Sequence, residues 1–483
     1  MARLWRVSFW QVLLLLAGAL VIAQVYWFNW KLDDAYISFA YARNWVEGKG
    51  IVFNEGERVE GYTCFLWVAL MALGLWLQLP IEPWSTALGT VFALGSLLLT
   101  AALAHEVLPQ GRRWAAAGAA LLAALWPPFA WWAASGMETT LFAFLVTASL
   151  WAHVRTAGSS PWVGVVAALA ALTRPEAWLL GGLLAADAIR LQRRKGVWVG
   201  LTFLAIFGTY FAWRTWYYGY LLPNTFYAKV GTTTEQIVRG WVYLKSFLWN
   251  WGACLFLTAW LPVVTAHRRR LLVVYAFIAL YAAYVVVVGG DVFHFFRFWV
   301  PLFPALCALS YAGILHVNAL APSWQDRIAL GAIVGLLCFW LAWTTRVSLQ
   351  EQSQHAIVAR NLRNLGFVTC RCLQSKTAPG DSVASLGIGV IKWCTNLRVI
   401  DMLGLTDLHI ARHAQVPMGA GLAGHEKYDS KYVLSRKPEY ILVSPLVPGA
   451  KRIVLPAERD MWAQPEFLMH YEKDECGYRR KHP

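Results

Sequence analysis

The sequence predicts a polytopic α-helical membrane protein that ends in a small soluble α/β domain. Of its 483 residues, 58% are hydrophobic and only 14% are charged, whereas about 25% of residues are charged in soluble proteins. From about Arg346 polar residues become frequent, and short strand-like runs such as 440–444 alternate with Gly and Pro. We therefore expect a transmembrane domain in residues 1–346, with about 11 helices, and a periplasmic α/β domain in residues 347–483.

The first element is an apolar segment from Phe9 to Trp30, which follows Arg3 and Arg6. It is long enough to span a bilayer and lacks a small-residue cleavage site, so we expect an uncleaved helix with a cytoplasmic amino terminus. Residues 31–83 would then form the first periplasmic loop.

The next apolar segment, residues 61–79, is predicted to lie along the outer interface as a juxtamembrane helix. If it crossed the membrane, Arg112 and Arg113 would face outward and the last domain would face inward, against the positive-inside rule. The later spans are predicted at residues 84–106, 114–132, 137–153, 197–213, 249–266, 271–288, 299–317 and 327–345, with a bent hairpin that breaks at residues 173–176 and ends at Arg190. This odd total places the carboxyl terminus outside.

The formal net charge of +15 comes largely from basic runs between apolar segments, such as residues 190–195 and 267–270. Runs in these positions set membrane topology, and attraction of anionic lipid or a phosphorylated substrate would add to that role. We therefore expect membrane lipids among the partners, and no nucleic acid.

Four cysteines fall in the predicted outer domain, where an oxidising compartment permits disulfides. They are Cys370, Cys372, Cys394 and Cys476. One or two bridges are expected, with connectivity left open, although Cys370 and Cys372 are too close in sequence for an easy bridge. The remaining four cysteines, Cys64, Cys254, Cys307 and Cys338, have apolar surroundings and are expected to be buried packing residues.

Ionisable or polar residues that stand out in apolar sequence fall mainly on the predicted outer side. They are Asp33, Asp34, Arg43, Glu60, Glu138, Asn224, Lys229, Asp291 and Arg297. Charges at a bilayer boundary are costly unless they line a wet, protein-walled cavity, so they indicate a functional site, with a structural network of ion pairs as the alternative.

Carboxylates and cations together suit transfer of a group from a phosphate. A carboxylate removes a proton from the attacking hydroxyl, while Arg or Lys neutralises the leaving phosphate. The adjacent Asp33 and Asp34 are the candidate catalytic carboxylates, and the alternative is that one of them caps a helix beginning at Ala35.

Structural alternatives apply to several of the other charged residues as well. Glu138 suits capping as well as catalysis. For Arg174 and Glu176 an ion pair with each other is favoured over contact with a ligand. Asp291 and Arg297, six residues apart, suit either a substrate site or a structural bridge.

Seven motifs in this chain resemble the membrane glycosyltransferases of the C-type superfamily, above all the bacterial arabinofuranosyltransferase branch. The motifs are DDAYISFAYARNWVEGKGIVFNEGERVEGYT from Asp33, SGMET from Ser135, LTRPE from Leu172, YYGYLLPNTFYAK from Tyr217, GGDVFHFFRFWVP from Gly289, and VIDMLGLTDLHIAR with GHEKY in the outer domain. Ala40 stands where the branch commonly has a basic residue and Cys64 where it commonly has Asn, which leaves the exact sugar open.

This resemblance implies that Asp33 or Asp34 is catalytic and that the donor is a polyprenyl-phosphate sugar such as decaprenyl-phosphoryl arabinofuranose. Residues expected to contact the donor phosphate or sugar are Arg43, Glu60, Tyr62, Glu138, Asn224, Lys229, Asp291 and Arg297. His425, Glu426 and Lys427 are expected to contact the acceptor or to form a lid, with a solvated turn as the alternative. A divalent cation is a possible cofactor, and the sequence decides neither metal dependence nor whether the reaction inverts or retains configuration.

The main hypothesis is therefore a glycosyltransferase that acts at the outer face of a bacterial inner membrane on an envelope glycan or a protein acceptor such as a pilin. A transporter or flippase for a lipid-linked sugar is one alternative, because broken helices and intramembrane charge also serve transport. A non-catalytic envelope scaffold that binds lipid-linked sugar is the other.

Overall fold

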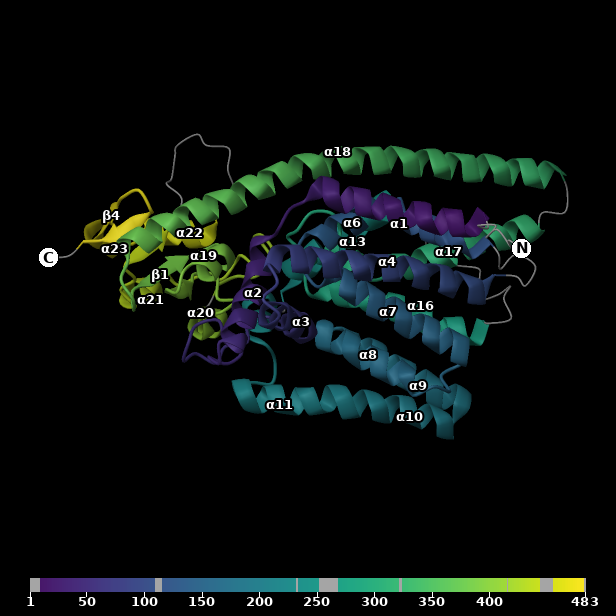
Figure 1. The fold of residues 1–483 in the computed structure, drawn as a ribbon, viewed down its shortest axis with the longest axis horizontal. Coiled ribbons are helices and arrows are strands. Elements are labelled where there is room, and N and C mark those ends of the chain that lie inside the picture. Colours follow the sequence, from purple (N-terminus) through teal and green to yellow (C-terminus); the bar gives the residue numbers. More distant parts are fainter. Residues whose placement is uncertain are drawn as a thin grey trace, which may run out of the picture.

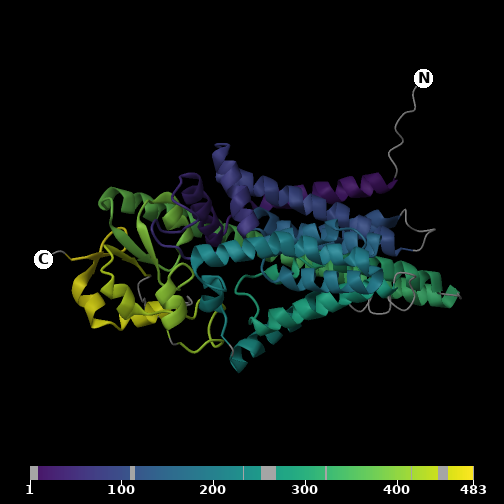
Figure 2. The same cartoon turned by 90° about the horizontal axis from the view of Figure 1, so that it is seen from below.

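The computed structural model describes residues 9–108, 115–231, 233–251, 268–320, 324–414, 416–443 and 455–481. Its helical part is a bundle of roughly aligned helices, and the α/β domain stands at one end of that bundle (Figures 1 and 2). The first helix, α1 (Phe9–Phe28), begins at the end of the bundle that lies far from this domain.

The helices of the bundle follow the apolar segments of the sequence. They are α4 (Ile81–Val107), α5 (Ala117–Ala124), α6 (Pro127–Ala134), α7 (Thr139–Thr156), α8 (Trp162–Thr173), α9 (Ala177–Gln192), α10 (Arg194–Phe203) with its continuation η2 (Leu204–Gly208) and α11 (Thr209–Tyr218), α13 (Thr234–Trp251), α16 (Arg268–Val287), α17 (Phe303–Leu320) and α18 (Trp324–Lys376). By length and composition, four helices among the described residues suit a membrane crossing: α1, α4, the α10 to α11 unit and α16. The protein is thus a multi-pass membrane protein, while the predicted total of about 11 crossings is not established.

Several spans differ from the prediction. The expected span at 114–132 is two short helices, α5 and α6, bent by 68° where Pro127 and Pro128 open α6. Most of the expected span at 249–266 lies outside the described residues. A helix that the sequence analysis did not predict, α13, precedes it, and its strongly amphipathic pattern explains why a search for apolar runs missed it.

Two short helices lie between α1 and α4 in the chain, α2 (Asp33–Val46) and α3 (Phe65–Trp76). α3 falls within the predicted juxtamembrane segment. Its 12 residues span about 18 Å, too short for a hydrocarbon core of about 30 Å. α3 packs against α2 and also touches α4 and α8.

The soluble domain contains one five-stranded sheet in the order β2-β1-β3-β5-β4. The strands are β1 (Ser382–Ser385), β2 (Arg398–Asp401), β3 (Tyr440–Leu442), β4 (Tyr471–Lys473) and β5 (Tyr478–Arg480), and the helices are α19 (Gly389–Cys394), α20 (Leu408–His413), α21 (Ser430–Ser435), α22 (Pro456–Trp462) and α23 (Pro465–His470). β1 is parallel to β2 and β3, whereas β5 is antiparallel to β3 and β4. The α/β class follows the sequence prediction.

The boundary expected between residues 346 and 347 lies inside a single helix. α18 has 53 residues, about 80 Å at the usual rise, and Figure 1 shows it running along the bundle and on to the α/β domain. Two disulfides, Cys370–Cys394 and Cys372–Cys476, fix its end to α19 and to the segment between β4 and β5.

These two disulfides confirm that bridges form among the four cysteines of residues 347–483 and supply the connectivity that the sequence left open. Among the other cysteines, Cys64 and Cys307 are buried, as predicted. Cys254 and the side chain of Cys338 lie outside the described part of the chain.

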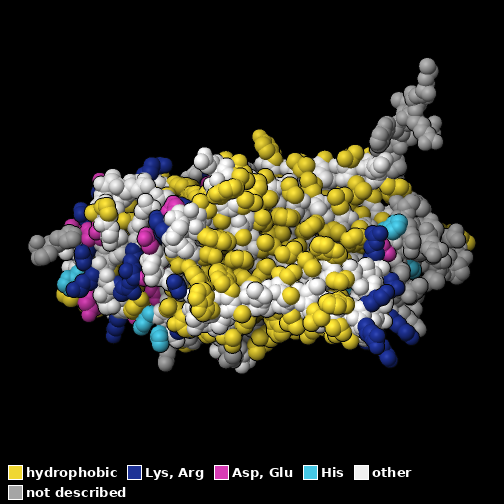
Figure 3. Space-filling model, turned by 60° about the horizontal axis from the view of Figure 1, so that its bottom comes forward, with side chains coloured by type: hydrophobic (Ala, Val, Ile, Leu, Met, Phe, Trp, Pro, Cys, Tyr) yellow, Lys and Arg dark blue, Asp and Glu magenta, His cyan; other side chains and the backbone are white. Residues whose placement is uncertain are grey.

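A broad band of hydrophobic side chains covers the bundle (Figure 3), while charged side chains gather at its two ends. One end is the α/β domain, which carries both signs of charge. The basic run 190–195 lies at the junction of α9 and α10, at the end of the bundle far from that domain (Figure 1). This distribution is that of a membrane-spanning bundle with its basic loops on one side.

Candidate active site

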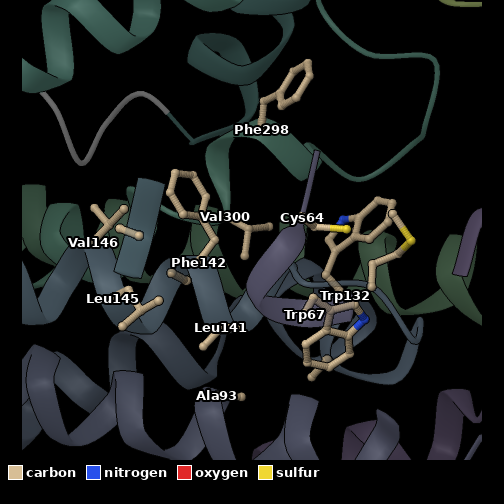
Figure 4. Close-up of a cluster of buried hydrophobic side chains, with 14 of the residues drawn as sticks. Cys64, Trp67, Ala93, Trp132, Leu141, Phe142, Leu145, Val146, Phe298 and Val300 are labelled. Carbon is tan, nitrogen blue, oxygen red and sulfur yellow. The ribbon is translucent and has the colours of Figure 1, made fainter. Parts of the chain in front are cut away.

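A cavity of about 420 Å³ lies where the segment from α2 to α3, the helix ends of the bundle and the α/β domain meet. Seven charged side chains line it: Asp34, Glu138, Arg174, Glu176, Lys229, Asp291 and Arg297. Cys64 and Phe298 also line the cavity, and both belong to the cluster of buried side chains in Figure 4. The cavity is therefore supported by the rigid interior of the bundle.

Asp34 reaches the cavity from the first turn of α2. That helix begins at Asp33, where acidic side chains suit the positive end of the helix dipole. The preceding turn is fixed because the Leu32 N–H donates to the Ser135 carbonyl at 3.1 Å. Asp34 is thus presented by a helix whose start is anchored to the bundle.

The neighbouring Asp33 points to the α/β domain instead. Its carboxylate accepts hydrogen bonds from the N–H groups of Gly389 and Val390, both at 2.9 Å, at the start of α19. Burial raises the pKa of Asp33, although these two N–H groups oppose that shift. Asp33 does not line the cavity, so it serves to attach the domain to α2.

Three of the cavity carboxylates are already paired with arginine. Arg174 donates to Glu138 at 2.8 Å and to Glu176 at 2.5 Å, which confirms the predicted pairing of Arg174 with Glu176. Arg297 binds Asp291 through two hydrogen bonds of 2.8 and 3.1 Å.

Glu138 precedes α7, but its side chain makes no cap hydrogen bond. The capping role considered from the sequence is therefore not the role that the structure gives it. The ion pair with Arg174 takes its place.

Lys229 faces these groups from α12 (Asn224–Lys229). Burial lowers the pKa of Lys229, and the negative charge of Asp34 opposes that shift. Gly424 lies directly over its side chain, since a Cβ at that glycine would be 3.1 Å from the lysine Cε. Among the charged side chains of the cavity that the structure describes, Asp34 and Lys229 are the two that form no hydrogen bond or ion pair.

Asn224 does not line the cavity, but it holds α12 in place. Its Nδ2 lies within hydrogen-bond distance of the carbonyls of Gly404, Leu405 and Asp407, at 2.9 to 3.1 Å. Leu405 itself lines the cavity. The α/β domain thus supplies part of the cavity wall and fixes the helix that carries Lys229.

The structure brings Tyr62 to the cavity, and its hydroxyl lies 3.0 Å from that of Tyr218. Glu60 lies outside the cavity in a buried ion pair with Arg214. Arg43 also lies outside it and donates to the carbonyls of Trp393 at 2.6 Å and Lys392 at 3.2 Å. Neither Glu60 nor Arg43 is placed to contact a ligand in the cavity.

Three further candidates, His425, Glu426 and Lys427, form a supporting loop. Glu426 accepts hydrogen bonds from the N–H groups of Gly419 and Gly421 and from Arg239 of α13. Lys427 donates to the Ala411 carbonyl at 2.6 Å, and a His425 ring nitrogen lies 3.1 Å from the Ala423 carbonyl. These contacts shape residues 423 and 424, which line the cavity.

Sequence reasoning did not include Arg174 and Glu176 among the site residues, although both line the cavity. The signal was the charged break between α8 and α9, where the Arg174 backbone is extended rather than helical. It also missed the apolar rim residues Trp178 and Phe226, which hydropathy alone does not distinguish from ordinary lipid-facing residues.

Within the described residues, no group of three or more His, Cys, Asp or Glu side chains is placed to hold a metal ion. Asp34 offers the one unpaired carboxylate of the described cavity wall, so a divalent cation would have to take its other ligands from substrate and water.

The amino-acid sequence of this chain is similar to those of two named bacterial enzymes. A terminal β-(1→2)-arabinofuranosyltransferase of Corynebacterium glutamicum is 29% identical over 394 residues, which are 69% of this chain and 55% of that protein. The enzyme of the same name from Mycobacterium tuberculosis is 37% identical over 114 residues, which are 22% of this chain and 18% of that protein. The predicted resemblance to bacterial arabinofuranosyltransferases is thus confirmed, while the chain spans less than two thirds of either relative.

Two further similarities concern the fold and the outer domain. The crystal structure of an oligosaccharyltransferase from Archaeoglobus fulgidus matches with a TM-score of 0.46 and 10% identity, over 81% of this chain and 64% of that one. Residues 350–476 match a family described as a domain of unknown function, DUF8728.

Proposed function

We propose that this protein is a membrane glycosyltransferase that transfers D-arabinofuranose from a polyprenyl-phosphate donor to an acceptor at the outer face of a bacterial inner membrane. The acceptor class would be an envelope glycan or a protein such as a pilin. The sequence similarity to two named arabinofuranosyltransferases supports the reaction class and the sugar. The observation that carries the proposal is that, among the described residues, one carboxylate without a partner, Asp34, and one ammonium without a partner, Lys229, line the same cavity.

The proposed reaction is attack of an acceptor hydroxyl on the anomeric carbon of the donor. Asp34 removes the proton of that hydroxyl as the new glycosidic bond forms. The bond from the anomeric carbon to the phosphate oxygen breaks, and polyprenyl phosphate leaves with the bonding electrons. Lys229 stabilises the charge that develops on this phosphate, and a single displacement inverts the anomeric configuration.

Asp34 and Lys229 are assigned these roles because the other described charged side chains of the cavity are already held in ion pairs. Arg174 and Arg297 each hold carboxylates, so each offers a phosphate less net positive charge than Lys229 does. The proposal does not assign the base to Asp33, because both of its carboxylate oxygens accept hydrogen bonds from α19.

The rim of the cavity suits a lipid-linked donor. Trp178 and Phe226 line it, yet they are 56% and 40% exposed on the surface of the protein. Both large apolar side chains therefore join the cavity to the hydrophobic band around the bundle. A polyprenyl chain would leave the cavity between helices and continue into the lipid, while its phosphate stays beside Lys229.

The test is sugar transfer by purified protein in nanodiscs, given decaprenyl-phosphoryl arabinofuranose and a mixture of envelope glycan and pilin acceptors. The wild type should transfer the sugar. Asp34→Asn should bind the donor and lose about 10²-fold or more in turnover, because general base catalysis typically contributes that much. The matched control is Glu47→Gln, which removes a carboxylate from the exposed end of α2 and should retain activity.

Two outcomes would contradict the proposal. Donor binding without transfer or donor hydrolysis by the wild type would point to a scaffold. Movement of the intact donor between leaflets of proteoliposomes, unchanged in Asp34→Asn, would point to a flippase.

A further inference from the structure

We infer that Glu138 forms the sugar subsite of the cavity, where its carboxylate accepts a hydrogen bond from a ring hydroxyl of the donor sugar. This inference rests on the proposed function and adds to it a division of the cavity. Lys229 would bind the phosphate of the donor, and Glu138 would recognise the sugar.

Glu138 has one carboxylate oxygen in use and one without a partner. Its Oε1 accepts a hydrogen bond from Arg174 at 2.8 Å. Its Oε2 is buried and receives no hydrogen bond from any described residue. Water cannot readily replace that bond, because the side chain is only 2% exposed. A buried charged oxygen without a hydrogen-bond donor is energetically costly. A bound ligand that donates a hydrogen bond to this oxygen would remove that cost.

A neighbouring protein group that could donate a hydrogen bond to Glu138, the Cys64 thiol, is a poor donor. The thiol of Cys64 lies near the Glu138 carboxylate and also lines the cavity. A thiol is a weak hydrogen-bond donor. It lies 3.5 Å from the hydroxyl of Ser38, which gives the sulfur a partner elsewhere.

The charge around Glu138 selects the chemical class of the ligand group. Glu138 and Glu176 share the single guanidinium of Arg174, so this group of three side chains carries net negative charge. A phosphate would be repelled there, whereas a neutral hydroxyl can donate to a carboxylate and accept from a guanidinium. The hydroxyls of a furanose ring fit this requirement, and the phosphate fits the Lys229 side.

Glu176 provides a matched comparison, because it binds the same arginine and is equally buried. Its Oε2, like that of Glu138, has no hydrogen-bond partner among the described residues. Glu176 differs in having the hydroxyl of Tyr284 beside its carboxylate, so the protein itself offers it a donor. Glu138→Gln and Glu176→Gln therefore remove the same charge from the same ion-pair group, and the inference assigns sugar recognition to Glu138 alone.

The experiment measures binding of two probes to the full-length protein in nanodiscs: decaprenyl phosphate, which lacks the sugar, and decaprenyl-phosphoryl arabinofuranose. Glu138→Gln should raise the Kd of the sugar-bearing lipid about tenfold, because a hydrogen bond to a charged group is lost. Its Kd for decaprenyl phosphate should stay within about twofold of the wild type. Glu176→Gln should change neither Kd by more than about threefold, while Lys229→Met should weaken both probes.

Three results would overturn the inference. Equal weakening of both probes by Glu138→Gln, shared by Glu176→Gln, would mean that the residue only supports the cavity through Arg174. No change for either probe would remove Glu138 from recognition. If the wild type binds neither probe, the proposed function itself fails, and this outcome is distinct from the first two because it appears without any substitution.

Discussion

Asp33 and Asp34 are adjacent in the first turn of α2, yet their carboxylates face different parts of the protein. Asp33 accepts two hydrogen bonds of 2.9 Å from the start of α19, whereas Asp34 lines the cavity. One turn of helix therefore fixes the outer domain and presents the proposed base. Docking of the domain and orientation of Asp34 are linked through this turn.

The contact between Asp33 and α19 requires glycine at position 389. A Cβ at Gly389 would lie 1.9 Å from the Asp33 carbonyl oxygen, closer than two such atoms can approach. We expect Gly389→Ala to separate α19 from α2 and to destabilise the docked domain by about 1–3 kcal/mol. Hydrogen exchange of residues 389–394 and the thermal midpoint of unfolding measure this.

Gly380→Ala is the control for this experiment. It makes the same substitution at a glycine where a Cβ meets no atom within 4 Å. Its positive φ of 97° adds backbone strain, so its effect should appear in overall stability without faster exchange in α19. Equal exchange of α19 in the wild type and in Gly389→Ala would contradict the anchoring role of Asp33.

The sequence identified this pair of aspartates but could not divide their roles. Both stand in the same helical turn at the membrane boundary, so local pattern treats them alike. Their difference comes from α19, more than 350 positions later in the chain. The same limit applies to Glu60, whose partner Arg214 comes from α11, and to Arg43, which binds carbonyls at the end of α19.

Hydropathy predicted the apolar helices and the break at residues 173–176, because each depends on local composition. It missed α13, two of whose polar side chains donate to backbone carbonyls of another segment. Arg239 donates to the Gly289 carbonyl at 3.0 Å, and Gln236 donates to that of Val288 at 2.9 Å. These bonds hold the turn that precedes Asp291, so a helix outside the predicted set supports the cavity.

The two disulfides should contribute unequally to the stability of the outer domain. Cys372–Cys476 closes a separation of 104 residues and Cys370–Cys394 one of 24. In the chain-entropy description these loops correspond to roughly 5 and roughly 3 kcal/mol. Replacing each pair by serine and measuring chemical unfolding should therefore give the larger loss for Cys372 and Cys476; a larger loss for the other pair would show that the short bridge does more than restrict the unfolded chain.

The outer domain should lose stability as the pH rises through about 6. Burial raises the pKa of Asp401 to about 6, so the folded state binds this proton more tightly than the unfolded state does. The resulting stabilisation is complete below the unfolded value near 4 and is lost as the carboxyl ionises. Asp401 also accepts the N–H groups of Leu403 and Thr406, and thereby shapes the loop that contains Leu405.

Asp401→Asn tests this assignment because an amide does not titrate. The variant should be less stable than the wild type at pH 5, since the amide NH₂ cannot accept the Thr406 N–H. Its unfolding midpoint should change less between pH 5 and pH 7.5 than that of the wild type. Parallel pH profiles for the two proteins would assign the pH dependence to another group.

Binding of polyprenyl phosphate should weaken at alkaline pH because Lys229 loses its proton there. Burial lowers the pKa of this lysine, and the phosphate binds the protonated form, so affinity falls as the pH rises above the pKa of the free protein. The Kd of decaprenyl phosphate, measured from pH 7 to pH 10, should rise for the wild type. In Lys229→Met it should be about tenfold or more higher at pH 7 and change little with pH. A wild-type Kd that stays constant over this range, together with normal binding by Lys229→Met, would assign the phosphate to another cation of the described cavity wall, Arg174 or Arg297.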